Sequence, residues 1–124
     1  MLPWQPDAEA LVVVSTTVAD DASGRRLAQL ALQGRLAACV QLSVIESHYV
    51  WEGELQQEPE RRLLFKTTVQ AYSALERLLL EHHPYAVPMV AAEPLVAVSA
   101  DYRAWVLQAV RPAPDSDRHP PSPG

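Results

Sequence analysis

The feature that most restricts the fold of this chain is a long β-rich stretch, residues 36–51, which has no helical periodicity. Glu52 and Gly53 then supply a turn, and Arg62–Thr68 is predicted to be the returning strand. A straight strand over residues 36–51 would be about 50 Å long at roughly 3.3 Å per residue. A compact domain of this size has a radius of gyration of only about 13 Å. The hairpin must therefore either bend back sharply or project beyond the domain.

A projecting hairpin would expose the side chains of Tyr49, Trp51 and Leu55, together with an unpaired strand edge. We expect a partner subunit to cover such an arm, because burial of this apolar surface is favourable. The alternative is a bulge that folds the hairpin back over the domain.

A strand and a helix precede the hairpin. Residues 10–17 are a continuous β-branched run, which predicts a strand covered on both faces. Asp20 and Asp21 offer an N-cap for a helix. One face of this helix contains Leu27, Leu30, Ala31 and Gly34. We expect Gly34 to end the helix in a left-handed conformation.

A second helix, a strand and a last helix follow the hairpin. The stripe of the second helix contains Tyr72, Leu75, Leu79 and His82. Residues 89–98 predict a strand in which Pro94 marks a bulge, a break or an edge position. Asp101 can cap the last helix, whose packed face is predicted to contain Tyr102, Trp105, Val106 and Ala109. The order βαββαβ plus a C-terminal helix predicts an α+β, ferredoxin-like sandwich with a long hairpin between its second and third strands.

Composition excludes several classes of protein. Hydrophobic residues make up 48% of the chain, which is enough for a core, and the net charge of −5 argues against a nucleic-acid-binding protein. The single cysteine, Cys39, permits no intrachain disulfide and fits a reducing compartment. Neither a signal-peptide pattern nor an apolar run of about 20 residues is present in the sequence. We therefore expect a cytoplasmic protein that binds neither nucleic acid nor membranes.

The two ends differ in composition from the rest of the chain. We predict one domain over residues 1–111, in which residues 1–9 form a short leader. Residues 112–124 are almost entirely polar or proline and cannot bury enough apolar surface to offset the entropy of ordering them. They are predicted to be a disordered, proline-rich tail.

Residues 82–88, with the sequence HHPYAVP, join the second helix to the following strand. The two prolines restrict the backbone to one path, and rigid loops that carry imidazole and phenol groups are frequent binding sites. The alternative interpretation is a helix stop with no further role.

Five segments, in this order, resemble the CutA family of divalent-cation tolerance proteins: Arg35–Val40, Ser47–Gly53, Phe65–Thr68, His82–Pro88 and Asp101–Trp105. The resemblance implies a ferredoxin-like homotrimer, similar in fold to the PII signalling proteins, whose hairpins pack between neighbours. It also implies a ligand pocket near the subunit boundary, formed by Trp51, Lys66, His83, Tyr85, Tyr102 and Trp105. Met89 stands where the family commonly has an acidic residue, so an oxygen ligand for hard cations is missing.

Metal binding is the first functional hypothesis. The chain has no second cysteine and no pair of histidines at i and i+4, so it lacks a zinc framework. His82 and His83 diverge by about 100° on a helix, and only His83 faces a plausible pocket. We predict a trimer that takes part in the response to metal ions. We expect Cu(II) or another divalent ion to bind with modest affinity at a site that contains His83 and is completed across a subunit boundary. No cofactor is expected to be obligatory.

A small anion is the second hypothesis. Lys66 is the sole lysine, and the family pattern surrounds it with aromatic side chains, which suits an anionic ligand. The protein would then be a PII-like signalling module with an inter-subunit pocket, unless Lys66 pairs with a carboxylate, such as Glu60 on its own strand or an acid of a neighbour. No motif links a nucleophile to a base and no glycine-rich phosphate loop is present, so we do not expect an enzyme.

Overall fold

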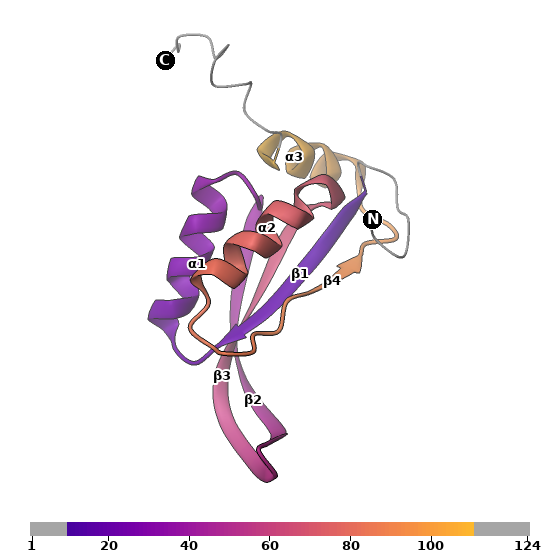
Figure 1. Ribbon diagram of the computed structural model, residues 1–124. Coiled ribbons are helices and arrows are strands. Elements are labelled where there is room, and N and C mark those ends of the chain that lie inside the picture. The colour runs from indigo at the N-terminus through magenta and orange to yellow at the C-terminus, as the bar shows by residue number, and fades with distance from the viewer. Residues whose placement is uncertain (1–9, 111–124) are drawn as a thin grey trace.

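The computed structural model describes residues 10–110, which form an antiparallel four-stranded sheet with the first two helices packed on one face and the last helix at the end of the sheet, near the start of the first strand (Figure 1). The elements in chain order are β1 (Leu11–Val18), α1 (Asp21–Gln33), β2 (Cys39–Trp51), β3 (Glu54–Thr68), α2 (Val69–His82), β4 (Ala91–Pro94) and α3 (Ala100–Val110). The strand order is β2-β3-β1-β4, and every pair is antiparallel. The predicted ferredoxin-like sandwich is confirmed. The predicted leader and tail lie outside the described residues.

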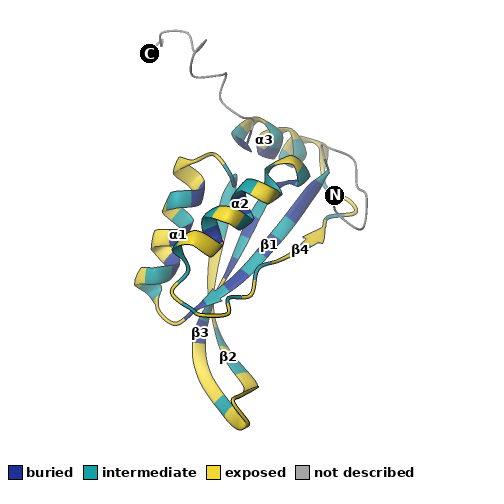
Figure 2. Ribbon diagram, in the orientation of Figure 1, coloured by how far each residue is buried: buried dark blue, intermediate teal, exposed yellow. Residues whose placement is uncertain are grey.

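The core lies between the sheet and the pair α1 and α2, as the dark blue segments of Figure 2 show. Alternate residues of β1 point into it, and Val12, Val14 and Val18 are fully buried there. The other face of β1 is half-buried, so the prediction of a strand covered on both faces is wrong for a single subunit. The reason is the antiparallel topology, which leaves α1 and α2 on the same face of the sheet.

The β2–β3 hairpin projects beyond the helices (Figure 1). Its strands pair from Cys39 opposite Lys66 to Trp51 opposite Glu54. The expected turn is confirmed: Glu52 has φ 52° and Gly53 has φ 82°, the left-handed pair that suits a two-residue hairpin. The strand β3 is longer than predicted, since it begins directly after this turn. Most of the arm is exposed, as the yellow ribbon of Figure 2 shows.

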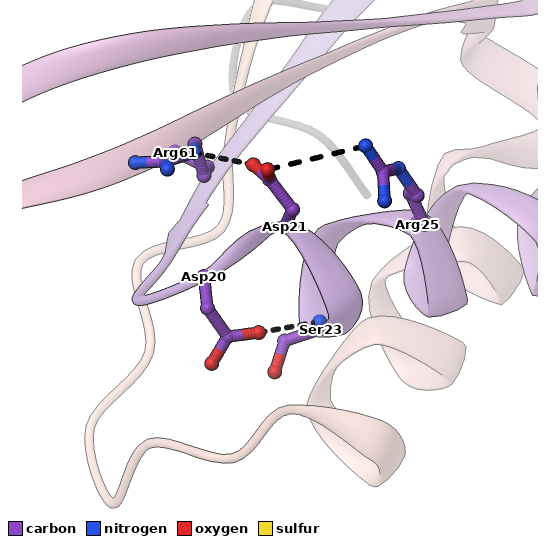
Figure 3. A network of polar contacts seen from close by, with 5 residues as sticks. All are labelled: Asp20, Asp21, Ser23, Arg25 and Arg61. Atoms are coloured by element: carbon purple, nitrogen blue, oxygen red, sulfur yellow. Dashed lines mark hydrogen bonds and ion pairs between the residues drawn. The ribbon is translucent and has the colours of Figure 1, made fainter.

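A polar network fixes the start of α1 to the base of the hairpin (Figure 3). The side chain of Asp20 caps the helix by accepting a hydrogen bond from the backbone N–H of Ser23 at 2.7 Å. Asp21 accepts a hydrogen bond from Nε of Arg61 at 2.5 Å and lies 3.9 Å from the guanidinium of Arg25. Arg61 is the first residue of β3, in chain order, that pairs with β1, so this contact marks the point at which the hairpin leaves the sheet.

The end of α1 differs from the prediction by one residue. Gly34 has φ −82°, and it is Arg35 that takes the left-handed conformation, with φ 58°. The guanidinium of Arg35 donates hydrogen bonds to the backbone oxygens of Gln108 and Ala109, at 3.2 and 3.4 Å. These contacts with the end of α3 favour arginine at position 35, although glycine would adopt the left-handed conformation more easily.

The C-terminal elements depart from the prediction in two ways. The strand β4 is a short edge strand that ends at Pro94, whereas residues 89–98 were expected to be extended. On α3 the buried residues are Val106 and Val110, which pack with Leu11, and Trp105 is half exposed. The expected packed face is therefore wrong in including Trp105. None of the helices within residues 10–110 has the length and apolar character that a membrane span requires.

Candidate functional site

A cavity of about 590 Å³ lies where the hairpin leaves the sheet. The loop that follows α2 passes this point on its way to β4 (Figure 1). The residues that line the cavity come from the end of β1, from the arm and from that loop: Thr17, Ala19, Tyr49, Trp51, Glu58, Glu60, Pro84, Tyr85, Ala86, Val87 and Met89.

Strand periodicity explains which arm residues reach the cavity. Tyr49 and Trp51 are two residues apart on β2, and Glu58 and Glu60 are two residues apart on β3, so all four share one face of the hairpin. That face is opposite the one that α1 and α2 cover. The loop brings Tyr85 to the same place, because Pro84 restricts its path directly after the helix.

Each carboxylate of the cavity accepts a hydrogen bond from a tyrosine. The hydroxyl of Tyr85 donates to Oε2 of Glu60, and the hydroxyl of Tyr49 donates to Oε1 of Glu58, both at 2.5 Å. Burial and the hydrogen bond to Glu60 raise the pKa of Tyr85 well above its usual value. Glu60 itself is only 7% exposed, and no cationic side chain within residues 10–110 forms an ion pair with it. The cavity therefore contains a buried acidic group that a cation would stabilise.

His83, the C-cap of α2, lies behind Tyr85 and not on the cavity wall. The backbone N–H of Tyr85 donates to Nδ1 of His83 at 3.1 Å, so the ring proton must be on Nε2. Nε2 then donates to the backbone oxygen of Thr17 at 2.9 Å. Burial lowers the pKa of His83. The hydrogen bond to the Thr17 oxygen and the charge of Glu60 act in the opposite direction but have smaller effects. In this conformation neither nitrogen has a lone pair free for a metal ion.

The six residues predicted to form one ligand pocket fall into two groups within a subunit. Trp51 and Tyr85 line the cavity, and His83 contacts Tyr85 with ring centroids 5.0 Å apart. The other three, Lys66, Tyr102 and Trp105, come from the end of β3 and from α3. A single subunit does not bring the two groups together, and their union across a subunit boundary stays a prediction.

The second group has its own contacts. Lys66 lies opposite Cys39 in the sheet and donates to Oε1 of Gln41 at 3.2 Å, so it does not pair with Glu60 as the alternative interpretation proposed. The rings of Tyr102 and Trp105 are 5.7 Å apart. Burial, and to a smaller extent the charge of Cys39, raises the pKa of Tyr102.

Glu58 was not identified from the sequence, and Glu60 was considered only as a partner for Lys66. The signal that could have found them is the alternation of Glu54, Gln56, Glu58 and Glu60 once the returning strand is counted from Gly53. Because the returning strand was predicted to begin at Arg62, the prediction omitted this part of the strand. Within residues 10–110 no three His, Cys, Asp or Glu side chains are close enough to hold one metal ion, so one subunit does not supply a complete metal site.

The fold defines a ferredoxin-like domain with a long projecting hairpin, and comparison with known proteins supplies its family. Residues 12–109 match the family described as CutA1 divalent ion tolerance protein. The divalent-cation tolerance protein CutA of Escherichia coli is 38% identical over 112 residues, which are 90% of this chain and 100% of that protein. The chain belongs to the CutA1 divalent ion tolerance family.

Solved structures agree with this assignment. CutA from Synechococcus elongatus has a TM-score of 0.80 and 37% identity, with 82% of this chain and 91% of that chain covered. CutA1 from Oryza sativa has a TM-score of 0.79 and 36% identity, with coverage of 82% and 94%. A CutA from Archaeoglobus fulgidus that is described as periplasmic has a TM-score of 0.80 at 24% identity, with coverage of 82% and 99%, and shows the fold alone.

Proposed function

We propose that this protein, a member of a family for divalent-cation tolerance, acts by binding Cu(II) or another divalent cation with modest affinity in a trimer. The observation that carries the proposal is the cavity at the base of the hairpin. It holds two carboxylates, Glu58 and Glu60, and is lined by no basic side chain. Such a site attracts cations and disfavours anions.

Modest affinity follows from the state of the donors. His83 is proposed as a ligand, but it must first give up the hydrogen bond from the N–H of Tyr85. Met89 lines the cavity where an acidic residue would have added an oxygen ligand. The bound ion would therefore be one that accepts imidazole, such as Cu(II) or Zn(II), rather than Mg(II) or Ca(II).

The trimer is proposed from the exposed apolar surface of the arm. Val44, Val50 and Leu55 are 70%, 64% and 86% exposed in the subunit and lie on the same face of the hairpin. Val50 and Leu55 are cross-strand neighbours, and exposed apolar side chains of this kind favour association. Packing of the arm against a neighbour would also allow the two groups of predicted pocket residues to meet, one from each subunit.

A small-anion site is the second candidate, at the other end of the sheet. The ammonium of Lys66 contacts the neutral amide of Gln41 and forms no ion pair within residues 10–110, so its charge is available to a ligand. Neither candidate requires catalysis, and we propose that the protein is not an enzyme. We also propose a cytoplasmic location, without nucleic-acid or membrane partners.

Isothermal titration separates the two candidates. Wild-type protein is titrated with Cu(II), Zn(II) and Mn(II), and with a panel of nucleotides and carboxylates. Metal binding is expected to be saturable, and to weaken in His83→Ala while the exposed hairpin variant His48→Ala leaves it unchanged. Saturable anion binding that Lys66→Ala abolishes, with no metal binding, would instead favour the anion candidate.

A further inference from the structure

We infer that the hairpin cavity also binds an organic cation, specifically a guanidinium group carried by an alkyl chain. The inference goes beyond the proposed function, because it needs neither a metal ion nor His83. It rests on two independent features of the cavity wall, which are a buried acid and a group of aromatic rings.

The buried acid is Glu60. This residue is only 7% exposed. Within residues 10–110 its carboxylate accepts one hydrogen bond, from the neutral hydroxyl of Tyr85. A buried carboxylate is costly unless a cation pairs with it. Arg62, two residues further along the same face of β3, forms no ion pair with Glu60. The structure thus leaves one acidic group without its counter-ion at the edge of a cavity.

The aromatic wall distinguishes an organic cation from a metal ion. Tyr49, Trp51 and Tyr85 all line the cavity, and Trp51 is 46% exposed within the subunit. Guanidinium suits such rings better than a strongly hydrated metal ion does, because it is planar, stacks on aromatic rings and is weakly hydrated. A cavity of about 590 Å³ is also far larger than a bare ion and can take the head group together with several methylenes.

The remaining acceptors suit the donor fork of guanidinium. Each carboxylate gives one oxygen to a tyrosine, Glu58 to Tyr49 and Glu60 to Tyr85. The second oxygen of each accepts no hydrogen bond from the described residues, so two acceptors remain. Glu58 and Glu60 are two positions apart on one strand, about 7 Å along its axis, which a planar group with donors on several edges can address.

The test is a calorimetric titration of the full chain with butylguanidinium, with the neutral isostere butylurea as the matched ligand. We expect butylguanidinium to bind at least about tenfold more tightly than butylurea. Glu60→Gln should remove most of this preference, because it keeps an acceptor for Tyr85 but removes the charge. Glu93→Gln, which removes the same charge on β4, should change the affinity less than about twofold. Equal affinity for the two ligands at every protein concentration, or a preference that survives in Glu60→Gln, would overturn the inference.

A second variant and a metal titration keep the result interpretable. Trp51→Leu, at a half-exposed position, tests the aromatic wall if Glu60→Gln fails to fold. It is titrated at a protein concentration at which sedimentation shows the wild-type mass, and loss of binding by about fivefold or more is expected. If the preference for butylguanidinium is absent while Cu(II) still binds, the inference fails and the proposed metal function stands. If the preference is present and no divalent ion binds, the inference stands and the proposed metal function fails.

The guanidinium could belong to a free molecule or to an arginine of a neighbouring copy, and dilution distinguishes these sources. A free ligand should bind the assembled protein with a constant affinity. An arginine of a neighbouring copy would block the ligand until the assembly dissociates, so that binding appears only at low protein concentration.

Discussion

The backbone N–H of Tyr85 donates a hydrogen bond to Nδ1 of His83, and this contact decides which nitrogen of the imidazole carries its proton. Because Nε2 then donates to the oxygen of Thr17, the neutral ring bridges the loop after α2 and the end of β1. The contact holds the cavity wall at Tyr85 in place, and it also withholds His83 from a metal ion.

Stability should depend on pH through His83. Burial lowers its pKa, so the folded protein keeps the ring neutral while the unfolded chain takes up a proton near pH 6.5. The contribution of His83 is therefore complete above about pH 6.5 and is lost as the pH falls toward the lower folded pKa. We expect the melting temperature to fall between about pH 7 and 5 in wild-type protein, and to fall less in His83→Gln. An identical slope in both proteins would contradict this role, and His48→Gln serves as the exposed control.

Trp51→Ala should weaken assembly more than it weakens the subunit. Trp51 is 46% exposed in the subunit, so its truncation removes little intrachain packing. Phe65→Ala is the matched comparison, because Phe65 is fully buried and its truncation should cost about 3–5 kcal/mol of folding free energy. Sedimentation equilibrium should show dissociation of Trp51→Ala on dilution, with circular dichroism unchanged. A mutant that keeps the wild-type mass on dilution would place Trp51 outside the subunit contact.

Met89→Glu should strengthen the binding of hard divalent ions. Met89 lines the cavity with Glu58 and Glu60, and a third carboxylate there supplies the oxygen that Mn(II) prefers. Titration with Mn(II) should show an affinity increase of several-fold, and Cu(II) should change less. Leu80→Glu adds the same charge on α2 and should have no such effect. Equal gains in both variants would indicate a general electrostatic effect instead of a site.

Gly53→Ala should destabilise the arm. Gly53 has φ 82°, and an added Cβ meets no atom within 4 Å, so the penalty comes from the backbone conformation alone. The expected cost is about 1 kcal/mol. Glu52→Asn should act in the opposite direction, since asparagine tolerates the left-handed conformation of that position better. Hydrogen exchange of the hairpin amides measures both effects, and protection that is unchanged in both variants would show that the turn does not limit the stability of the arm.

Local periodicity was sufficient to predict the order of the elements, because each strand and helix carries its own apolar pattern. The start of β3 was missed because its outer half is polar except for Leu55 and contains Pro59, which usually argues against a strand. Pro59 is tolerated because β1 pairs with β3 only from Arg61 onward, so one edge of the outer strand is free. The left-handed Arg35 depends on contacts with α3, which no local pattern contains.

The site was predicted in part. Residues 82–88 include Tyr85, which lines the cavity together with Trp51. The carboxylates were missed together with the outer half of β3. The distance between the two groups of predicted pocket residues could not be read from the sequence, since it depends on where α3 packs.

Electron paramagnetic resonance of Cu(II) bound to the assembled protein at pH 7 tests the central claim most directly. The proposal predicts one saturable Cu(II) per subunit, with a nitrogen coupling from imidazole that disappears in His83→Ala and persists in His48→Ala. A spectrum of hydrated copper alone, or a nitrogen coupling that is unchanged in His83→Ala, would contradict it.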